Sequence, residues 1–182
     1  NEEHTRGAKM SELLYQLKIS HSKKLHLKTS IRSFRSDNVS KFVNALLDVD
    51  KQNAQKYYKK IRKKYPVFIT RDLSHAKKWV RKKMRGNERG GLVASSNGYR
   101  LFPDGIYVKN SLDVVNWFLS PKDDVRSSSH LELVATEFEI QGLEIDWACI
   151  AWDADLRFTN NSRSCYKWSN SAKPPNWRNA NA

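Results

Sequence analysis

The sequence has little of what marks secreted or membrane proteins. Its 182 residues include 2 Cys, 7 Gly and 5 Pro. Two cysteines, Cys149 and Cys165, are too few for a disulfide framework, and we expect both to be reduced thiols. No apolar run approaches the roughly 18 residues that a membrane-spanning helix needs, and residues 1–10 contain no apolar stretch of the kind found in secretory signals. We therefore expect a cytoplasmic protein without a membrane partner.

Several signatures of catalytic and metal sites are also missing. No G-x-x-x-x-G-K-[ST] phosphate loop occurs, so the chain does not contain a complete ATPase site. The five His residues are scattered without zinc-site spacing, which predicts no metal centre. One acidic pair, Asp153 and Asp155, could hold a metal ion in a nuclease, and this stays open as an alternative.

The charge of the chain is large and unevenly distributed. The formal net charge is +14. Residues 1–100 contain 25 Lys/Arg and 8 Asp/Glu, whereas residues 101–182 contain 8 and 11. A segregated positive charge favours a polyanionic partner, and nucleic acid is the commonest one for a protein of this class. The alternative is a solvated basic surface.

Apolar periodicity predicts four helices and four short strands after residue 36, and the leucines of residues 11–18 also have helical spacing. The helix that ends near Asp48 would be capped by Ser36 or Asp37, and the last helix by Asn110 or Ser111. The polar tail from Asn160 is expected to be a loop or a frayed end. The predicted helices are 37–48, 51–63, 73–85 and 112–119, and the predicted strands are 67–70, 92–95, 134–140 and 145–152.

This alternation of helices with short apolar strands indicates an α/β fold. The expected architecture has three layers, with a mainly parallel sheet covered by helices on both faces. We expect Trp79, Trp117, Trp147 and Trp152 to lie in or beside its core. Trp168 and Trp177, in the polar tail, are the candidates for stacking on nucleic-acid bases.

The segment ATEFEIQGLEID carries the most specific chemical pattern. A Gly allows close backbone approach to a phosphate, a carboxylate accepts hydrogen bonds from a ribose, and a Thr donates to a phosphate. The segment resembles motif V of superfamily 1 helicases, Thr, a spacer, then Lys/Gln-Gly-Leu-Glu. The resemblance implies that Thr136 contacts the nucleic-acid backbone and that Gln141, Gly142 and Glu144 contact the nucleotide.

An earlier segment, Ser-Ile-Arg-Ser at residues 30–33, resembles helicase motif IV. In that family the Arg reaches the γ-phosphate, a task that suits a permanently charged, forked guanidinium. Arg32 is therefore the candidate arginine finger, with Arg35 as the next choice. Thr70 and Arg71 lie at the end of the predicted strand 67–70. This position resembles the place where such helicase domains make a further contact with the nucleic-acid backbone.

Residues 27–157 together resemble the bacterial Schlafen group 3-like DNA/RNA helicase family. The carrying runs are SIRSFRSDNVSKFVNALLD, FITRDLSHA, GLVASS and VATEFEIQGLEIDWACIAWDADLR. The resemblance implies one RecA-like second helicase domain over 1–182, with 1–26 and 158–182 peripheral. It also implies a Walker-bearing RecA-like domain as partner, and ATP and Mg²⁺ would bind through that domain. The chain alone would bind neither tightly.

Three functions follow in order of support from the sequence. The first is the second motor domain of a helicase or translocase on single-stranded DNA or RNA. The second is a nucleic-acid-binding module without nucleotide dependence, which would use the basic helix 73–85 and its Lys78 and Lys82. The third is the nuclease built on Asp153.

Overall fold

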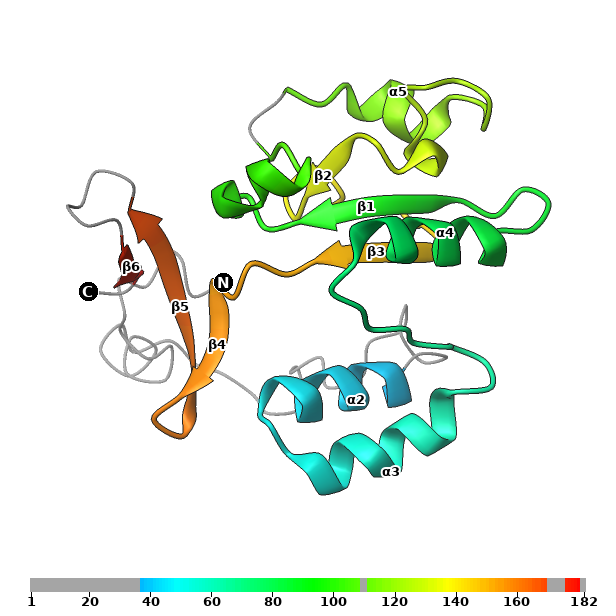
Figure 1. Ribbon diagram of the computed structural model, residues 1–182. Coiled ribbons are helices and arrows are strands. Elements are labelled where there is room, and N and C mark those ends of the chain that lie inside the picture. The colour runs from blue at the N-terminus through cyan, green and yellow to red at the C-terminus, as the bar shows by residue number, and fades with distance from the viewer. Residues whose placement is uncertain (1–36, 109–110, 170–175, 181–182) are drawn as a thin grey trace, which may run out of the picture. The chain divides into compact units, whose positions relative to one another are not determined.

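The computed structural model describes residues 37–108, 111–169 and 176–180 (Figure 1). Residues Val39–Ala182 form one compact unit. Its α-helices are α2 (Asp37–Leu47), α3 (Lys51–Ile61), α4 (Leu73–Lys83) and α5 (Val114–Leu119), and its 3-10 helices are η3 (Tyr99–Asp104) and η4 (Ser128–His130). Its strands are β1 (Gly90–Ala94), β2 (Val134–Thr136), β3 (Trp147–Ala151), β4 (Leu156–Thr159), β5 (Ser162–Ser169) and β6 (Asn176–Asn179).

Three of the helices begin at an aspartate cap. The carboxylates of Asp50, Asp72 and Asp113 each accept a hydrogen bond from the backbone N–H three residues later, at 2.9–3.1 Å. Each bond satisfies a donor that a helix leaves unpaired at its N-terminus. The four helices predicted after residue 36 are confirmed, but α5 starts after Asp113, and residues 11–18 lie outside the described residues. The predicted cap at Ser111 is therefore wrong, and Asn110 lies outside the described residues.

The central sheet is parallel and has the strand order β2-β1-β3. Leu92 of β1 lies in register with Val134 of β2 on one side and with Cys149 of β3 on the other. All five residues of β1 are buried, as expected for the middle strand of a sheet covered on both faces. The three strands end at the same edge of the sheet.

Two glycines at the start of β1 allow helices to pack closely on both faces. A Cβ atom at Gly90 would lie 2.6 Å from the Met84 sulfur and 3.0 Å from a Val80 methyl. A Cβ atom at Gly91 would lie 2.8 Å from the Trp117 ring. Since neighbouring residues of a strand point to opposite faces, α4 and α5 cover opposite faces of the sheet.

The core lies beside β1. Trp117, Leu92 and Leu131 are fully buried. Trp79 packs edge-on against Trp147 with ring centroids 5.7 Å apart, so both rings border the core as expected. Trp152 does not, because its side chain is 53% exposed. The buried cluster comprises Val80, Leu92, Ala94, Ile106, Val108, Leu131, Val134 and Cys149.

Two predicted strands differ from the structure. Residues 67–70 form no strand; Ile69 is 77% exposed, and Phe68 stacks on Trp79 with ring centroids 5.5 Å apart. Only the aromatic residue of this segment packs on α4, because the β-branched Val67 is exposed as well. The strand predicted over 134–140 ends at Thr136, where the chain enters a hydrogen-bonded turn.

The tail from Asn160 is not a loop in the described residues. Strands β4, β5 and β6 form a separate antiparallel sheet. Asn160 and Asn161 join β4 to β5 with φ angles of 51° and 59°. A two-residue hairpin turn of type I′ requires such left-handed angles at both positions, and Asn tolerates them better than most residues. The polar composition of the tail obscured this hairpin in the sequence.

The fold is therefore mixed α/β, with a small parallel sheet as predicted and an antiparallel sheet that was not. No helix in the described ranges is long and apolar enough to cross a membrane.

Candidate nucleic-acid interface

Polar groups from three strands meet at the carboxyl edge of the parallel sheet. Ser96 follows β1 by two residues, Thr136 ends β2, and Asp153 follows β3 by two residues. Helix α4 packs on β3 and runs opposite to the strands, so its first turn lies toward the same edge (Figure 1). In open α/β sheets, ligands bind at this edge.

Two carboxylates occupy the hydrogen-bond donors of the strand ends. The Ser96 amide and hydroxyl donate to the two Glu137 carboxylate oxygens, each at 2.8 Å. The Thr136 amide and hydroxyl both donate to one oxygen of Glu139, at 2.7 and 2.9 Å. Four donors are thus aimed at anionic groups. The sequence analysis did not select Ser96, and the available signal was the polar Ser-Asn-Gly run that follows the predicted strand 92–95.

The arrangement around Thr136 is the reciprocal part of a capping box. Thr-x-x-Glu places the Glu139 carboxylate on the amide of Thr136, while the amides of Glu139 and Ile140 donate to the Thr136 carbonyl at 3.1 and 3.2 Å. Thr136 is 7% exposed. A phosphate that replaced Glu139 would find the same two donors already oriented.

The rest of the motif lies along the return from β2 to β3. Gly142 has a φ of +82°, and a Cβ atom there would meet no atom within 4 Å. The glycine is required by its left-handed backbone and not by close packing. Gln141 and Glu144 flank it and are exposed. Thr136 lies at the carboxyl edge, whereas Asp146 already bonds to Arg89 at the start of β1, at 3.0 and 2.8 Å.

Thr70 and Arg71 lie immediately before α4 and not at the end of a strand. The Thr70 hydroxyl oxygen accepts a hydrogen bond from the Asp72 amide at 3.1 Å. Arg71 is exposed. The structure therefore corrects the element that carries this pair, while keeping it near the carboxyl edge of the sheet.

The basic surface of α4 divides into two halves. Lys77 and Arg81 bind Glu132, with nitrogen–oxygen distances of 3.0 and 3.2 Å. Lys78 and Lys82 are exposed and make no hydrogen bond or ion pair to the described part of the chain. Lys78 and Lys82 are therefore available to an anionic partner, whereas Lys77 and Arg81 hold α4 in place.

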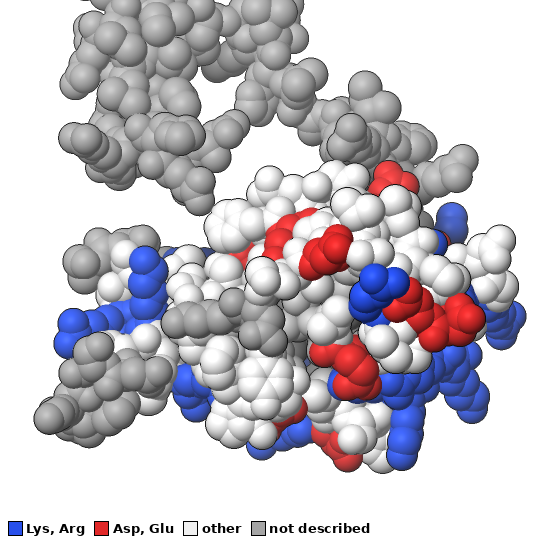
Figure 2. Space-filling model, turned by 90° about the horizontal axis from the view of Figure 1, so that it is seen from above, with Lys and Arg blue, Asp and Glu red and all other residues white. Residues whose placement is uncertain are grey.

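Helix α3 adds a basic stripe that the site prediction did not include. Residues 51–64 contain seven Lys/Arg and no Asp or Glu. Lys56 and Lys60 lie one helical turn apart and approach the Tyr57 ring, 5.7 and 5.8 Å from its centroid. Like charges at this spacing destabilise a helix unless an anion compensates them. Figure 2 shows one face of the molecule, where many Lys and Arg side chains project at the margins.

Asp153 is a buried carboxylate next to two arginines. Its side chain is 5% exposed, and its Oδ1 lies 3.5 Å from Arg100 Nη1. Its Oδ2 has no hydrogen-bond partner, and neither does Arg157 Nη2. Burial raises the pKa of the Asp153 carboxyl, and the charges of Arg100 and Arg157 oppose that rise. Within the described ranges, no three His, Cys, Asp or Glu side chains gather as a metal site would require.

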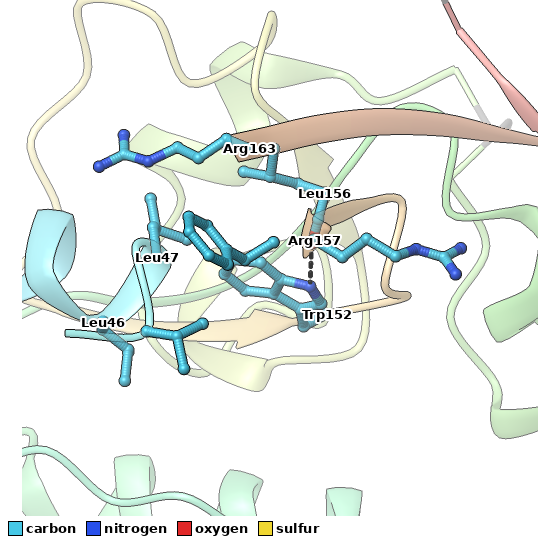
Figure 3. Close-up of a pocket in the computed structure, with 8 residues that line it drawn as sticks. Leu46, Leu47, Trp152, Leu156, Arg157 and Arg163 are labelled. Atoms are coloured by element: carbon cyan, nitrogen blue, oxygen red, sulfur yellow. Dashed lines mark hydrogen bonds between the residues drawn. The ribbon is translucent and has the colours of Figure 1, made fainter. Parts of the chain in front are cut away.

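An apolar hollow of about 260 Å³ lies between the end of α2 and the β4–β5 hairpin. Trp152 lies in it and donates through its indole N–H to the Leu156 carbonyl at 3.1 Å. Arg157 and Arg163 line its rim, and Figure 3 shows their guanidinium groups pointing away from the apolar centre. Because no charged group turns inward, the hollow has little to orient a nucleotide.

Trp168 and Trp177 do not present open ring faces in the manner that base stacking needs. Their ring centroids are 5.3 Å apart, and the Arg100 guanidinium lies 4.8 and 5.0 Å from them. The Arg32 and Arg35 candidates lie outside the described residues, so their geometry stays a prediction from the sequence.

We predict that Asp153→Asn reduces the pH dependence of stability. Because the native pKa of Asp153 is raised above its ordinary value near 3.8, the native state retains this proton to higher pH than the unfolded chain. The resulting stabilisation is fully present at low pH and is lost as pH rises through the native pKa. Urea unfolding between about pH 4 and pH 7 should show the variant gaining stability over the wild type as pH rises.

The matched control is Asp123→Asn, an exposed carboxylate that makes no hydrogen bond or ion pair to the described part of the chain. Equal pH slopes in Asp153→Asn and the wild type would contradict the assignment of a raised pKa to Asp153.

The family model described as Schlafen group 3, DNA/RNA helicase domain, matches residues 1–180. No curated protein and no solved structure matched the chain.

Proposed function

Since the chain belongs to the Schlafen group 3 DNA/RNA helicase domain family, we propose that it is the second, RecA-like motor domain of a helicase or translocase. In this role it binds single-stranded nucleic acid and completes an ATP site on a Walker-bearing first domain. The chain would not hydrolyse ATP by itself, because the phosphate loop and the Mg²⁺ ligands belong to that first domain.

The observation that carries this proposal is the set of oriented donors at the carboxyl edge of the parallel sheet. Thr136 and Ser96 each direct an amide and a hydroxyl at a carboxylate. A phosphate oxygen can take the place of a carboxylate oxygen on such a donor pair, since both are anionic acceptors. Binding of the backbone would then release Glu139 from Thr136 and Glu137 from Ser96.

This exchange gives the site a built-in competitor. While the backbone is absent, Glu139 keeps the buried donors of Thr136 satisfied, which avoids the cost of an unpaired polar group. When a phosphate arrives, the freed carboxylate moves to water. Thr70 and Arg71, before α4, add a second contact with the same strand in this proposal.

The nucleotide side of the proposal uses Arg32, Gln141, Gly142 and Glu144. Glu144 is exposed and would accept hydrogen bonds from a ribose, while Gly142 keeps the intervening turn in its left-handed conformation. Arg32 would reach the γ-phosphate of ATP on the partner domain. ATP with Mg²⁺ is the cofactor of the assembled site.

The basic helices would supply affinity that does not depend on base sequence. Phosphate neutralisation by Lys and Arg releases counterions and dominates such binding. Lys78 and Lys82 of α4 are suited to it because their ammonium groups are not already engaged with Glu132, unlike the side chains of Lys77 and Arg81.

A nucleic-acid-binding module without nucleotide dependence is the second candidate. The basic surface of α4 favours it, because Lys78 and Lys82 are exposed and can neutralise phosphates without a bound nucleotide. The nuclease alternative lacks such support, since Asp153 is buried beside Arg100.

We predict that Lys78→Gln/Lys82→Gln weakens binding to a single-stranded oligonucleotide and flattens its salt dependence. The slope of log K against log salt is negative, and each lost contact with a single strand reduces its magnitude by about 0.7. The double variant should therefore show a slope about 1.4 smaller in magnitude than the wild type. Fluorescence anisotropy over a range of salt concentrations measures both quantities.

The control Lys122→Gln/Arg126→Gln removes the same charge from positions where Lys122 bonds to the Gly86 carbonyl and Arg126 pairs with Asp124. If the α4 variant and this control have the same slope, the α4 surface is not part of the interface.

We also predict that Arg32→Ala abolishes most ATP turnover in a protein that joins this chain to its Walker-bearing domain. Loss of an arginine finger typically lowers turnover by about 10³-fold or more. Steady-state ATPase assays with saturating single strand test this, with Arg35→Ala as the matched variant. Turnover at the wild-type rate in Arg32→Ala would refute the assignment, and loss confined to Arg35→Ala would move it to that residue.

A further inference from the structure

The antiparallel sheet has two chemically different faces. Residues opposite each other on antiparallel strands point to the same side, so the pairs Trp168–Trp177 and Lys167–Arg178 lie on opposite faces. Burial agrees with this register: Tyr166 and both Trp residues are half-buried, whereas Cys165, Lys167 and Arg178 are exposed. We call these the aromatic face and the cationic face.

Guanidinium groups alternate with rings on the aromatic face. Arg157 lies 4.2 Å from the Tyr166 centroid and 4.6 Å from that of Trp177. Arg100, from η3, continues the series across Trp177 and Trp168. Each such contact contributes about 0.5–1 kcal/mol or more when desolvated. The series backs the sheet and holds β5 and β6 in a defined position.

The cationic face contains one anchored arginine and one unneutralised pair. Arg163 bonds to both Asp48 carboxylate oxygens, at 2.6 and 2.8 Å, and to the Asn44 side chain at 3.0 Å. Lys167 and Arg178 make no hydrogen bond through their side chains, and no ion pair, within the described part of the chain. Residues 156–169 and 176–180 contain four Lys/Arg and no Asp or Glu.

Two like charges directly opposite on paired strands destabilise a sheet. An anion between them converts that repulsion into attraction. The Cβ atoms of opposite residues lie about 4.5–5.5 Å apart, so an ammonium and a guanidinium can both reach one phosphate or two consecutive ones. The chain's net charge of +14 and its DNA/RNA helicase family favour a nucleic-acid phosphate over the carboxylates of an acidic protein.

We propose that the cationic face of β5 and β6, through Lys167 and Arg178, binds the phosphates of single-stranded nucleic acid. This contact is separate from the strand ends of the parallel sheet and from the proposed contact of Thr70 and Arg71. The inference rests on the proposed function in requiring nucleic acid as the partner, but it does not depend on ATP or on Thr136.

The first test is the double variant Lys167→Gln/Arg178→Gln in the full 182-residue chain, bound to fluorescent oligothymidylate or oligouridylate. The magnitude of the slope of log K against log salt should decrease by about 1.4, because two contacts are lost. The variant Lys122→Gln/Arg126→Gln, with the same net charge, should keep the wild-type slope. A slope equal to that of this control would overturn the proposal. Thermal unfolding checks the fold, and the variant should melt no lower than the wild type because the repulsion is removed.

A second test uses Cys165 as a reporter on the same face. Cys165 is exposed and lies two residues from Lys167, whereas Cys149 is 7% exposed and its burial raises the pKa of its thiol. Iodoacetamide should therefore alkylate Cys165 first, and Cys149 serves as an internal control. Saturating oligonucleotide should slow alkylation of Cys165 severalfold in the wild type, but not in Lys167→Gln/Arg178→Gln at matched occupancy.

The outcomes separate this inference from the proposed function. Oligonucleotide binding that leaves the alkylation rate of Cys165 unchanged would overturn the contact at Lys167 and Arg178 alone. Absence of any oligonucleotide binding would overturn the proposed function and this inference together. Protection of Cys165 by polyglutamate, but not by the oligonucleotide, would overturn it in favour of an acidic protein partner.

Discussion

The close approach of two helices to the first residues of β1 is the constraint on which the parallel sheet depends. Gly90 leaves room for Met84 and Val80 on one face, and Gly91 leaves room for Trp117 on the other. A side chain at Gly91 would displace the rigid Trp117 ring, and one at Gly90 would force Met84 aside and crowd Val80. With both helices seated, β1 is buried throughout and pairs with β2 and β3 in parallel, so that all three strands end at one edge.

That edge concentrates the polar chemistry of the described chain. Ser96 and Thr136 present amide and hydroxyl donors that Glu137 and Glu139 already satisfy, and Asp153 is buried beside Arg100. The same Arg100 extends across the aromatic face of the antiparallel sheet. The Arg100 guanidinium thus contacts both Asp153 and the aromatic face of the antiparallel sheet, which is the face opposite to Lys167 and Arg178.

Local chemistry made the helices predictable, while most of the site depends on contacts between distant residues. Apolar spacing predicts α2, α3 and α4, and the spacing from Thr136 to Glu144 locates the turn after β2. It does not reveal that Glu139 occupies the Thr136 donors, because the same Thr-x-x-Glu pattern serves helix capping and phosphate binding alike. Residues 67–70 have the β-branched and aromatic composition that favours a strand, but they are exposed, and Phe68 stacks on Trp79 of α4. The burial of Asp153 and the role of Ser96 follow from strand order, which no local pattern contains.

The central claim is that this chain contributes residues to one side of an ATP site and also binds single-stranded nucleic acid. Its most direct test is the affinity for a single strand, with and without a non-hydrolysable ATP analogue, of a protein that joins the chain to its Walker-bearing domain. The account predicts that the analogue changes this affinity and that Glu144→Gln removes the change while leaving the nucleotide-free affinity intact. The same affinity in both conditions for the wild type would contradict the motor assignment and leave a nucleotide-independent binding module.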